Sequence, residues 1–421
     1  MLRSPTSLLV IAFAAAVACR DSGNAASGAC DKSIRLPEGF CATVFTDSAG
    51  LARHIAVRSN GDVIVGMLDQ RRQAGGVMIL RDTDKDGRAD ASERFGESGV
   101  HGVVLAGDSV LYVSTSSAVI RYRLTDSLVP KRRVDTIVTG LVERKIPSHS
   151  LAIDPRGNLI VNIGAVSNGC QAKEAPGAPG RDPCPELAVS GGIWRFAPDK
   201  TNQTILDGVR IATGLHNAVA LAVSPHDTMV YAVSHGRDGL RDLWPNLYSE
   251  QENASAAAEE MIRIATVRAD FGWPYCYYDY LKDHRVLAPE YGGDKQDVVH
   301  CDRQIQPLIA FPAHWSPMSL LFYTGKMFPA QYRSGAFIAF HGSAYRAPLL
   351  QEGYHVVFLE FKDGFAAEYK VFADGFAGGS PSPETAAHRP TGLAEGPDGA
   401  LYLSDDRAGR IWRITYSSAK K

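Results

Sequence analysis

Histidine recurs at one position of a repeated phrase, and this repetition is the first sign of chemistry in the chain. The copies are HIAVRSNGDVIV (54–65), HGVVLAGDSVLYV (101–113), HSLAIDPRGNLIV (149–161), HNAVALAVSPHDTMVYAV (216–233), HRPTGLAEGPDGALYL (388–403) and a looser one at 314–340. Histidine exchanges a proton near neutral pH, so it can act as a general base. Six histidines share this position: His54, His101, His149, His216, His314 and His388.

Each copy is typical of two short β-strands around a tight turn, such as the one at Asn60–Gly61. The start of the first strand and the end of the second lie at the same end of a hairpin. We therefore expect the six histidines to meet at one end of the fold, together with the residues next to these strand ends. Those residues are His235, Arg237, His341, Arg346, Arg389, Asp405, Asp406 and Arg407.

The repeats also predict the fold. The first three copies lie roughly 48 residues apart, and a period in the forties with several strands per repeat is typical of β-propeller blades. Six copies predict an all-β, six-bladed β-propeller with long loop insertions at about 240–310 and 345–387. Strand 41–47 should complete the last blade and close the ring, and 254–262 should form at most a short helix. Outer strands are expected at 76–82, 117–124, 190–197 and 408–415.

Arginine and histidine at one end of a propeller favour a ligand with carboxylates. Arginine presents fixed, forked donors that match carboxylate oxygens. A histidine beside them could take a proton from an alcohol while a bound acceptor takes the hydride. The chain has no GxGxxG after a strand, no Walker loop and no GxSxG. Nicotinamide, nucleoside triphosphate and serine-hydrolase chemistry are therefore not supported.

A second motif predicts a metal site. The stretch DTDKDGRADASE at 82–93 fits the calcium-loop pattern D-x-D-x-D-G-x5-E. Hard oxygen ligands at this spacing suit Ca²⁺, although a solvated acidic turn would have a similar composition. Strand-like flanks favour a structural calcium loop on a blade over an EF-hand sensor. The predicted ligands are Asp82, Asp84, Asp86, the Arg88 carbonyl, Asp90 and Glu93.

The N-terminus and the cysteines predict export. Residues 1–18 have a positive start and an apolar run of signal-peptide length, and AVAC, which ends at Cys19, is similar to a lipoprotein cleavage site. Ordinary cleavage after Ala18 or downstream is the alternative. We expect 19–29 to be a tether, 30–418 the propeller, and the protein to be a periplasmic or outer-membrane lipoprotein with membrane contact only at Cys19. Six further cysteines suggest disulfides, most simply 30–41, 170–184 and 276–301.

Charge excludes one class of partner. The formal net charge is −2 and no basic tail or patch stands out, so nucleic acid is not an expected partner.

These motifs together resemble the pyrroloquinoline-quinone (PQQ)-dependent sugar dehydrogenases, in the branch often called L-sorbosone dehydrogenase-like. The resemblance runs from about residue 36 to 416. The matching stretches are GLHNAVALAVSP (214–225), VSHGRDGL (233–240), ADFGWPYCYYD (269–279), FPAHWSPMSLLFYTG (311–325), AFIAFHGSAYR (336–346) and HRPTGLAEGPDGALYLSDDRAGRIWRI (388–414).

The resemblance implies PQQ lying across the mouth of the propeller, a Ca²⁺ that polarises the quinone, and a histidine base acting on a sugar or polyol. Arg389 would hold a cofactor carboxylate, and the carbonyls of Gly236 and Arg237 would face the calcium. His149 would be the base, with His216 and His314 as alternatives. Other cofactor-side positions implied are His216, Asn217, Arg237, His314, Arg346 and Asp406.

Three positions depart from the family pattern. His216–Asn217 stands where the family commonly has Arg-Asn, HGSAYR stands where it has HGSWNR, and the family's base would fall nearer Ile146 than His149. Two alternatives therefore stay open: a quinone-free propeller that binds a glycan or protein partner, and a calcium-dependent lactonase-type hydrolase. The chain has no CxxCH haem site, so a quinoprotein would need a separate electron acceptor such as a c-type cytochrome or a quinone.

Overall fold

A computed structural model describes residues 28–418, except 71–73, 97, 131–133, 144–148 and 363–364. The predicted signal peptide and Cys19 lie outside these residues. No helix in the described part of the chain is long and apolar enough to cross a membrane.

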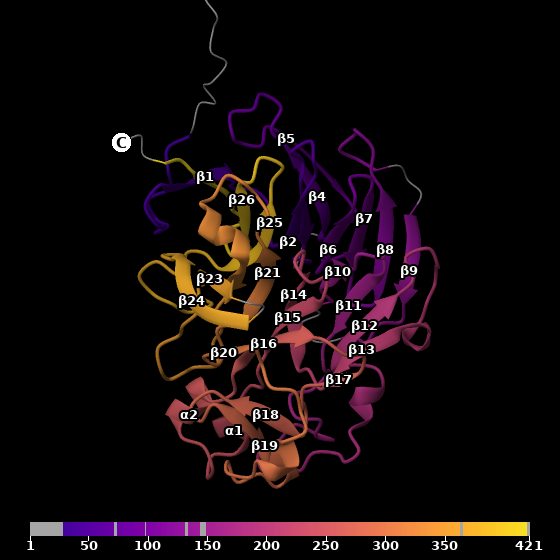
Figure 1. The fold of residues 1–421 in the computed structure, drawn as a ribbon, viewed down its shortest axis with the longest axis vertical. Helices are drawn as coiled ribbons and strands as arrows, with labels where there is room; N and C mark the ends of the chain where they lie inside the picture. The colour runs from indigo at the N-terminus through magenta and orange to yellow at the C-terminus, as the bar shows by residue number, and fades with distance from the viewer. Residues whose placement is uncertain are drawn as a thin grey trace, which may run out of the picture.

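Six antiparallel sheets follow one another around a ring (Figure 1), which confirms the predicted all-β, six-bladed propeller. Blade 1 contains β2 (Ala52–Val57), β3 (Val63–Met67), β4 (Gly76–Arg81) and β5 (Ala91–Phe95), from the channel outwards. Blade 2 contains β6 (Val103–Ala106), β7 (Val110–Ser114), β8 (Ala118–Arg123) and β9 (Val134–Thr139). Blade 3 contains β10 (Leu151–Ile153), β11 (Leu159–Ile163), β12 (Gly192–Phe196) and β13 (Val209–Thr213), with β17 (Ala269–Asp270) added at its edge.

The other three blades follow the same plan. Blade 4 contains β14 (Asn217–Val223), β15 (Val230–His235), β16 (Glu259–Ile264) and β20 (Ile309–Phe311). Blade 5 contains β21 (Pro317–Phe322), β22 (Gly335–Phe340), β23 (His355–Lys362) and β24 (Phe365–Ala373). Blade 6 contains β25 (Pro390–Glu395), β26 (Leu401–Asp405), β27 (Ile411–Tyr416) and, outermost, β1 (Phe40–Thr46).

The first and last strands of the chain close the ring. β1 pairs antiparallel with β27, with Cys41 opposite Thr415, as the sequence predicted. The innermost strands of neighbouring blades contact one another around the channel, and β25 of blade 6 contacts β2 of blade 1. Pairing with β1 covers the edge of β27 and ties the start of the propeller to its last blade.

Apolar packing between blades explains the strand sequences. The second strand of each blade is covered on both faces, so β3 and β22 are buried at every position. One cluster joins blades 6 and 1 through Phe45, Ile55, Val65 and Tyr402, with the rings of Phe45 and Tyr402 edge to face at 5.3 Å. Burying these side chains between the sheets holds the two blades together.

One predicted insertion forms a separate lobe beside the mouth (Figure 1). This insertion lobe, residues 240–258 and 271–308, has its own core around Leu240, Tyr248, Tyr277 and Val286. Its elements are α1 (Leu240–Leu243), α2 (Glu250–Ser255), β18 (Cys276–Asp279), β19 (His284–Leu287) and the 3-10 turns η3 (Pro289–Tyr291) and η4 (Val299–Cys301). The remaining 3-10 turns are η1 (Pro185–Ala188), η2 (Ile205–Asp207) and η5 (Ala330–Ser334).

Two sequence predictions need correction. The stretch 254–262 is not one helix, because α2 ends at Ser255 and β16 begins at Glu259. The region 345–387 is not only an insertion, since it contains β23 and β24, the outer strands of blade 5. Alanine-rich composition misled in the first case, where blade packing overrides the local preference.

The three predicted disulfides are confirmed as 30–41, 170–184 and 276–301. Such bonds are typical of proteins that fold in an oxidising compartment. The first fixes the chain at the start of β1, the second closes the loop after β11, and the third joins β18 to η4 in the insertion lobe.

Candidate functional site

The inner strands begin at one mouth of the channel, where the structure has a cavity of about 640 Å³. Its walls come from several blades and from α1, because each contributes a strand end or the loop that follows it. This confirms that strand ends from distant repeats meet at one place. The charged and titratable side chains of the lining are Arg53, Glu174, His216, His235, Asp238, Asp242, Glu259, His314, His341 and Arg389.

Asp406 holds two side chains of the basic wall. Arg53 Nη1 donates to Asp406 Oδ2 at 2.7 Å, and His341 Nε2 donates to Oδ1 at 2.8 Å. Burial opposes ionisation of Asp406, but the neighbouring His341 and Arg53 hold its pKa well below the ordinary value. Asp406 itself lies behind the lining, so its role is to fix the two residues in front of it.

Arg389 is held equally firmly. Its Nε donates to the His341 carbonyl at 3.2 Å and its Nη2 to the Gly342 carbonyl at 2.5 Å. Its guanidinium lies 6.0 Å from the ring centre of Tyr354. A Cβ at Gly342 would lie 2.3 Å from that ring, so only glycine lets the loop approach Arg389 this closely. A fixed, forked cation of this kind suits a carboxylate.

The opposite wall is acidic. His314 Nδ1 bonds Asp238 Oδ1 at 3.2 Å, and His314 Nε2 donates to the Asn253 carbonyl at 2.8 Å. Burial would lower the pKa of His314, but Asp238 raises it above the ordinary value, so the two form an ion pair. Glu259 is fully buried, and burial raises the pKa of its carboxyl to about 8.

His216 lines the cavity on the turn before β14. Its Nδ1 lies 2.9 Å from the carbonyl oxygen of Gly236. A carbonyl can only accept, so Nδ1 bears the hydrogen and Nε2 of the neutral ring has the lone pair. Gly236 also donates its N–H to Glu259 Oε2 at 3.1 Å, and a Cβ there would lie 2.2 Å from the Ala257 carbonyl oxygen. Glycine is therefore required where this loop passes β16.

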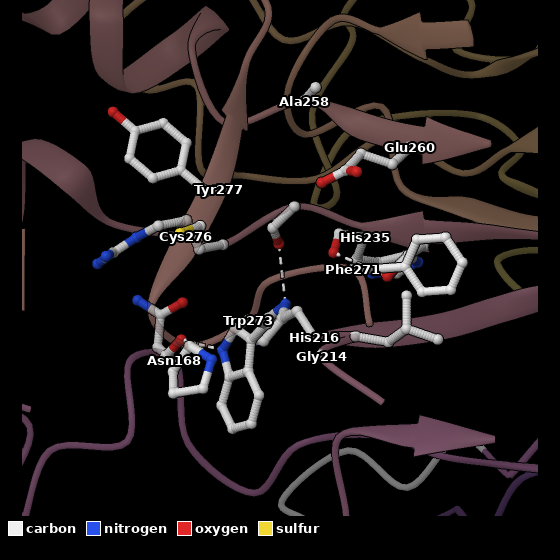
Figure 2. Close-up of a pocket in the computed structure, with 15 residues that line it drawn as sticks. Asn168, Gly214, His216, His235, Ala258, Glu260, Phe271, Trp273, Cys276 and Tyr277 are labelled. Carbon is white, nitrogen blue, oxygen red and sulfur yellow. Dashed lines mark hydrogen bonds between the residues drawn. The ribbon is translucent and has the colours of Figure 1, made fainter. Parts of the chain in front are cut away.

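A second cavity, of about 20 Å³, lies directly behind this wall (Figure 2). His216 and His235 line both cavities. Trp273 stands beside His216 with ring centres 6.4 Å apart, and its indole N–H donates to the Asn168 carbonyl at 2.8 Å. A space of this size with polar walls can hold about one water molecule.

The insertion lobe is joined to the mouth by a buried ion pair. Arg237 donates two hydrogen bonds to Glu290, one of them 2.7 Å from Nη2 to Oε1. Trp244 of the lobe donates to the same carboxylate at 3.1 Å. Next to Arg237, Asp238 exchanges two bonds with the Asn168 side chain. Both Asp238 and Asn168 line the cavity, so Glu290 sets the position of the wall through Arg237.

The predicted site residues do not all reach the cavity. Gly236, His216, Asn217, His314 and Arg389 line it. His149 lies elsewhere: its side chain is fully buried, with Nδ1 3.1 Å from the Asn162 carbonyl and Nε2 3.1 Å from the Ser116 carbonyl. It is not part of the cavity lining. One of these carbonyls belongs to β11 of the same blade and the other to the loop after β7 of blade 2, so the ring is held between the two blades.

Two predicted cofactor-binding arginines also point away from the cavity. The guanidinium of Arg237 faces Glu290, so only its backbone remains next to the lining residues Gly236 and Asp238. Arg346 is buried in its own loop, where Nη1 donates to the Ala254 carbonyl at 2.5 Å and Nη2 pairs with Glu352 at 2.8 Å. An arginine in a loop can donate its hydrogen bonds to nearby backbone carbonyls as readily as to a bound ligand.

Other members of the histidine ring lie one layer behind the lining. His54 bonds the Met318 carbonyl at 2.7 Å, and burial lowers its pKa to about 4. His101 is buried, and burial lowers its pKa to about 3. His388 Nδ1 bonds Asp405 Oδ2 at 2.7 Å. Position in the repeat therefore predicts the end of the blade but not the direction of the ring.

Sequence reasoning missed Arg53 and Glu259. Arg53 immediately precedes the recurring His54, and alternation along a strand would have placed it on the other face. Glu259 was hidden in the alanine-rich stretch expected to be helical. Its position at the start of β16 became visible only when blade 4 was complete.

The predicted calcium loop lies between β4 and β5, at the opposite end of blade 1 from the mouth. Oxygen atoms of Asp82, Asp84 and Asp86 lie within 4.8 Å of one another. Asp90 is not in this group, because it accepts the Thr83 N–H at 2.9 Å, and Glu93 is exposed on β5. Backbone N–H groups of the loop bond Asp82 and Asp86, which gives the loop a fixed shape.

The family profile described as TrAA12-like matches residues 34–417. The chain belongs to the TrAA12-like family. This result agrees with the resemblance inferred from the motifs at the level of PQQ-type sugar oxidoreductases, while the narrower sorbosone branch stays a prediction.

Solved structures share the fold of this TrAA12-like chain. A Trichoderma reesei protein of Carbohydrate-Active Enzymes family AA12 is 20% identical, with 91% of this chain and 98% of that chain covered and a TM-score of 0.74. The holo PQQ domain of pyranose dehydrogenase from Coprinopsis cinerea is 16% identical, with 92% and 98% covered and a TM-score of 0.73. The PQQ-bound aldose sugar dehydrogenase of Streptomyces coelicolor is 15% identical, with 91% and 100% covered and a TM-score of 0.56.

One curated relative matches part of the chain, and its description names no activity. An uncharacterized protein of Borreliella burgdorferi is 28% identical over 208 residues, which are 49% of this chain and 48% of that protein. The TrAA12-like chain thus spans about half the length of this relative. Substrate and partners are not fixed by any of these likenesses.

The Arg237–Glu290 ion pair should be essential for the stability of the cavity wall that contains Asn168 and Asp238. Glu290→Gln removes the negative charge and leaves the buried Arg237 cation uncompensated, which typically costs about 3–5 kcal/mol. We expect that loss in the free energy of unfolding by urea, and faster amide hydrogen exchange at 166–170 and 235–239. The control is Glu250→Gln, whose exposed pair with Arg241 at 3.3 Å should contribute under about 1 kcal/mol. Equal effects of the two variants would contradict the assigned role.

Proposed function

We propose that this protein is an exported quinoprotein oxidoreductase that oxidises a sugar, or a related alcohol or aldehyde, with PQQ as hydride acceptor. One observation supports it most directly. Two fixed guanidinium groups, on Arg53 and Arg389, line the same cavity as a histidine whose neutral tautomer has its lone pair on Nε2. The family match and the PQQ-bound structures of similar fold support the same choice of cofactor.

The residues present fit the cofactor. PQQ is a planar molecule with three carboxylates, and the basic wall offers Arg53 and Arg389 in positions that partner residues fix beforehand. Preorganised cations bind carboxylates without the cost of ordering flexible side chains. A cavity of about 640 Å³ is within the range of small-molecule sites and leaves room for a sugar beside the cofactor. When bound, the quinone would accept the hydride from the substrate, which carries two electrons.

We assign the role of general base to His216. The Gly236 carbonyl orients the ring through Nδ1–H, so a proton from a substrate hydroxyl can be taken only at Nε2. His314 is less suitable because its ion pair with Asp238 raises its pKa and keeps the ring protonated. His149 is less suitable because it lies outside the cavity lining. His235 lines the cavity too, and its Nε2 donates to the Pro317 carbonyl at 2.8 Å, so it is the alternative base.

A Ca²⁺ at the mouth is part of the proposal. The Gly236 carbonyl has two lone pairs, of which His216 uses one, and the Arg237 carbonyl follows it in the chain. Backbone carbonyls are ligands that Ca²⁺ accepts readily. Bound beside the quinone, the ion would polarise it. The Asp238 carboxylate lines the same part of the cavity.

Export and a separate electron acceptor complete the proposal. The three disulfides and the N-terminal segment support a periplasmic or outer-membrane lipoprotein attached at Cys19. The sequence contains no CxxCH haem-attachment motif. Electrons would therefore leave to another protein or a lipid-soluble molecule, such as a c-type cytochrome or a quinone.

Reconstitution tests the function. The purified protein is titrated with PQQ in the presence of Ca²⁺, and bound quinone is followed by its absorbance. We expect stoichiometric binding and sugar-dependent reduction of an artificial dye. Arg389→Leu should weaken quinone binding by about 100-fold, because it removes a charge-assisted, bidentate contact. Absence of both binding and dye reduction in the wild type would contradict the proposal and favour a quinone-free binding propeller.

His216 is tested by separating binding from turnover. His216→Gln keeps a hydrogen-bonding side chain but removes the base, so kcat should fall by about 10²–10⁴-fold while quinone binding changes little. The matched variants are His149→Gln and His235→Gln, which should retain most of the turnover. If the loss followed His235→Gln and not His216→Gln, the base would be His235.

We further propose that the loop 82–93 binds a structural Ca²⁺. Three aspartates already bring oxygen atoms within 4.8 Å of one another, and the Arg88 carbonyl and Glu93 stand at the remaining positions of the motif. Asp90 would contact the ion through a bridging water, or would give up its hydrogen bond with Thr83 to bind the ion directly. The loop is at the far end of blade 1 from the mouth, so the ion would stabilise the blade and take no part in turnover.

Calcium binding to this loop predicts a ligand-dependent rise in melting temperature. Millimolar Ca²⁺ should raise the Tm of the quinone-free protein by several degrees, and Asp84→Asn should remove most of that rise. Asp294→Asn, which changes an exposed aspartate in the insertion lobe, serves as control. An undiminished calcium effect in Asp84→Asn would refute the site.

A further inference from the structure

Half of the mouth cavity is negatively charged. Asp238 follows β15, Asp242 lies in α1, and Glu174 lies in the loop after β11, and all three line the cavity. The two arginines of the lining, Arg53 and Arg389, come from blades 1 and 6. The cavity therefore has a basic side, which suits the cofactor carboxylates, and an acidic side over blades 3 to 5.

Tyr345 lines the cavity together with these three carboxylates, and half of its surface (50%) is exposed, so a ligand can reach the ring. The charge of Asp238 is the largest cause of a raised pKa of the Tyr345 phenol, followed by burial and then by Glu174 and Asp242.

The position of Tyr345 is fixed by the insertion lobe. Asn253 of α2 donates to the Tyr345 carbonyl at 3.0 Å, and the Tyr345 ring lies 5.9 Å from the ring of His314. His314 is already paired with Asp238. The nearby cation Arg241 pairs with Glu250 and is not among the lining residues. Among the described residues, Glu174 and Asp242 have no ion-pair partner, so their charges stay available to a ligand. An aromatic face beside carboxylates of this kind suits an ammonium group.

We propose that this side of the cavity is a specificity subsite for the protonated amine of an amino sugar, with Tyr345, Asp242 and Glu174 as the selecting residues. The inference rests on the proposed function for its reaction, but not for its binding. A sugar ring with its reacting carbon toward the quinone would extend its other substituents into the acidic side. An ammonium there gains from the carboxylates of Glu174 and Asp242 and from the face of the Tyr345 ring, whereas a uronate is repelled.

The test measures sugar binding without turnover. Glucosamine, N-acetylglucosamine and glucuronate are titrated calorimetrically against the quinone-free protein and against the PQQ-loaded protein, at low salt and at a pH where the amine is protonated. N-acetylglucosamine is the matched neutral control. We expect glucosamine to bind about tenfold more tightly than N-acetylglucosamine, glucuronate to bind most weakly, and added salt to reduce the difference.

Variants identify the residues. The double variant Glu174→Gln/Asp242→Asn should reduce the preference for glucosamine to about threefold or less. Tyr345→Leu should reduce the preference for glucosamine by about two- to fivefold. Tyr345→Phe should keep the wild-type preference, because the aromatic face and not the hydroxyl attracts the cation. Glu250→Gln, outside the cavity on α2, should leave the preference unchanged.

The outcomes separate this inference from the proposed function. Equal binding of glucosamine and N-acetylglucosamine in both forms of the protein, or a preference that the double variant does not reduce, would overturn the subsite. Failure of PQQ to bind, with the amine preference intact, would contradict the proposed reaction and leave the subsite standing.

Discussion

Closure of the ring is the constraint on which the rest of the structure depends. β1, which precedes blade 1 in the chain, completes blade 6 by pairing with β27, so hydrogen bonds within blade 6 hold the two ends of the propeller together. Without that pairing β27 would be an exposed edge, and the inner strands would not be held around one channel. Because the blades are held at fixed angles, strand ends far apart in sequence meet at the mouth. Every contact of the candidate site depends on that geometry.

At the mouth, polar side chains are held by partners from neighbouring elements. Asp406 of blade 6 fixes Arg53 of blade 1 and His341 of blade 5, and the Gly236 carbonyl orients His216. Glu290 of the insertion lobe sets the loop of Asp238 through Arg237. Such second partners preorganise charge before a ligand arrives. They also divide the cavity into a basic side and an acidic side, which gives cofactor and substrate different places to bind.

The departures from the motifs of the resembled family gain a meaning from this arrangement. Where the family commonly has Arg-Asn, this chain has His216, and the structure offers Arg53 from blade 1 as a cation on the opposite wall. Where it has HGSWNR, this chain has HGSAYR, and Tyr345 supplies an aromatic ring one residue later, facing three carboxylates. The two changes are compatible with a retained cofactor site and an altered substrate side.

The sequence by itself determined the six blades, the closing strand, the three disulfides and the end of each blade at which histidine stands. These features follow from local periodicity, repeat length and cysteine order, which do not require knowledge of distant contacts. Only the tertiary structure decided which side chains face the cavity. His149 and His216 occupy equivalent places in the repeat, yet one bonds two buried carbonyls and the other lines the mouth. That difference arises because the direction of a side chain at a strand end depends on the neighbouring blade, and no local pattern encodes the neighbour.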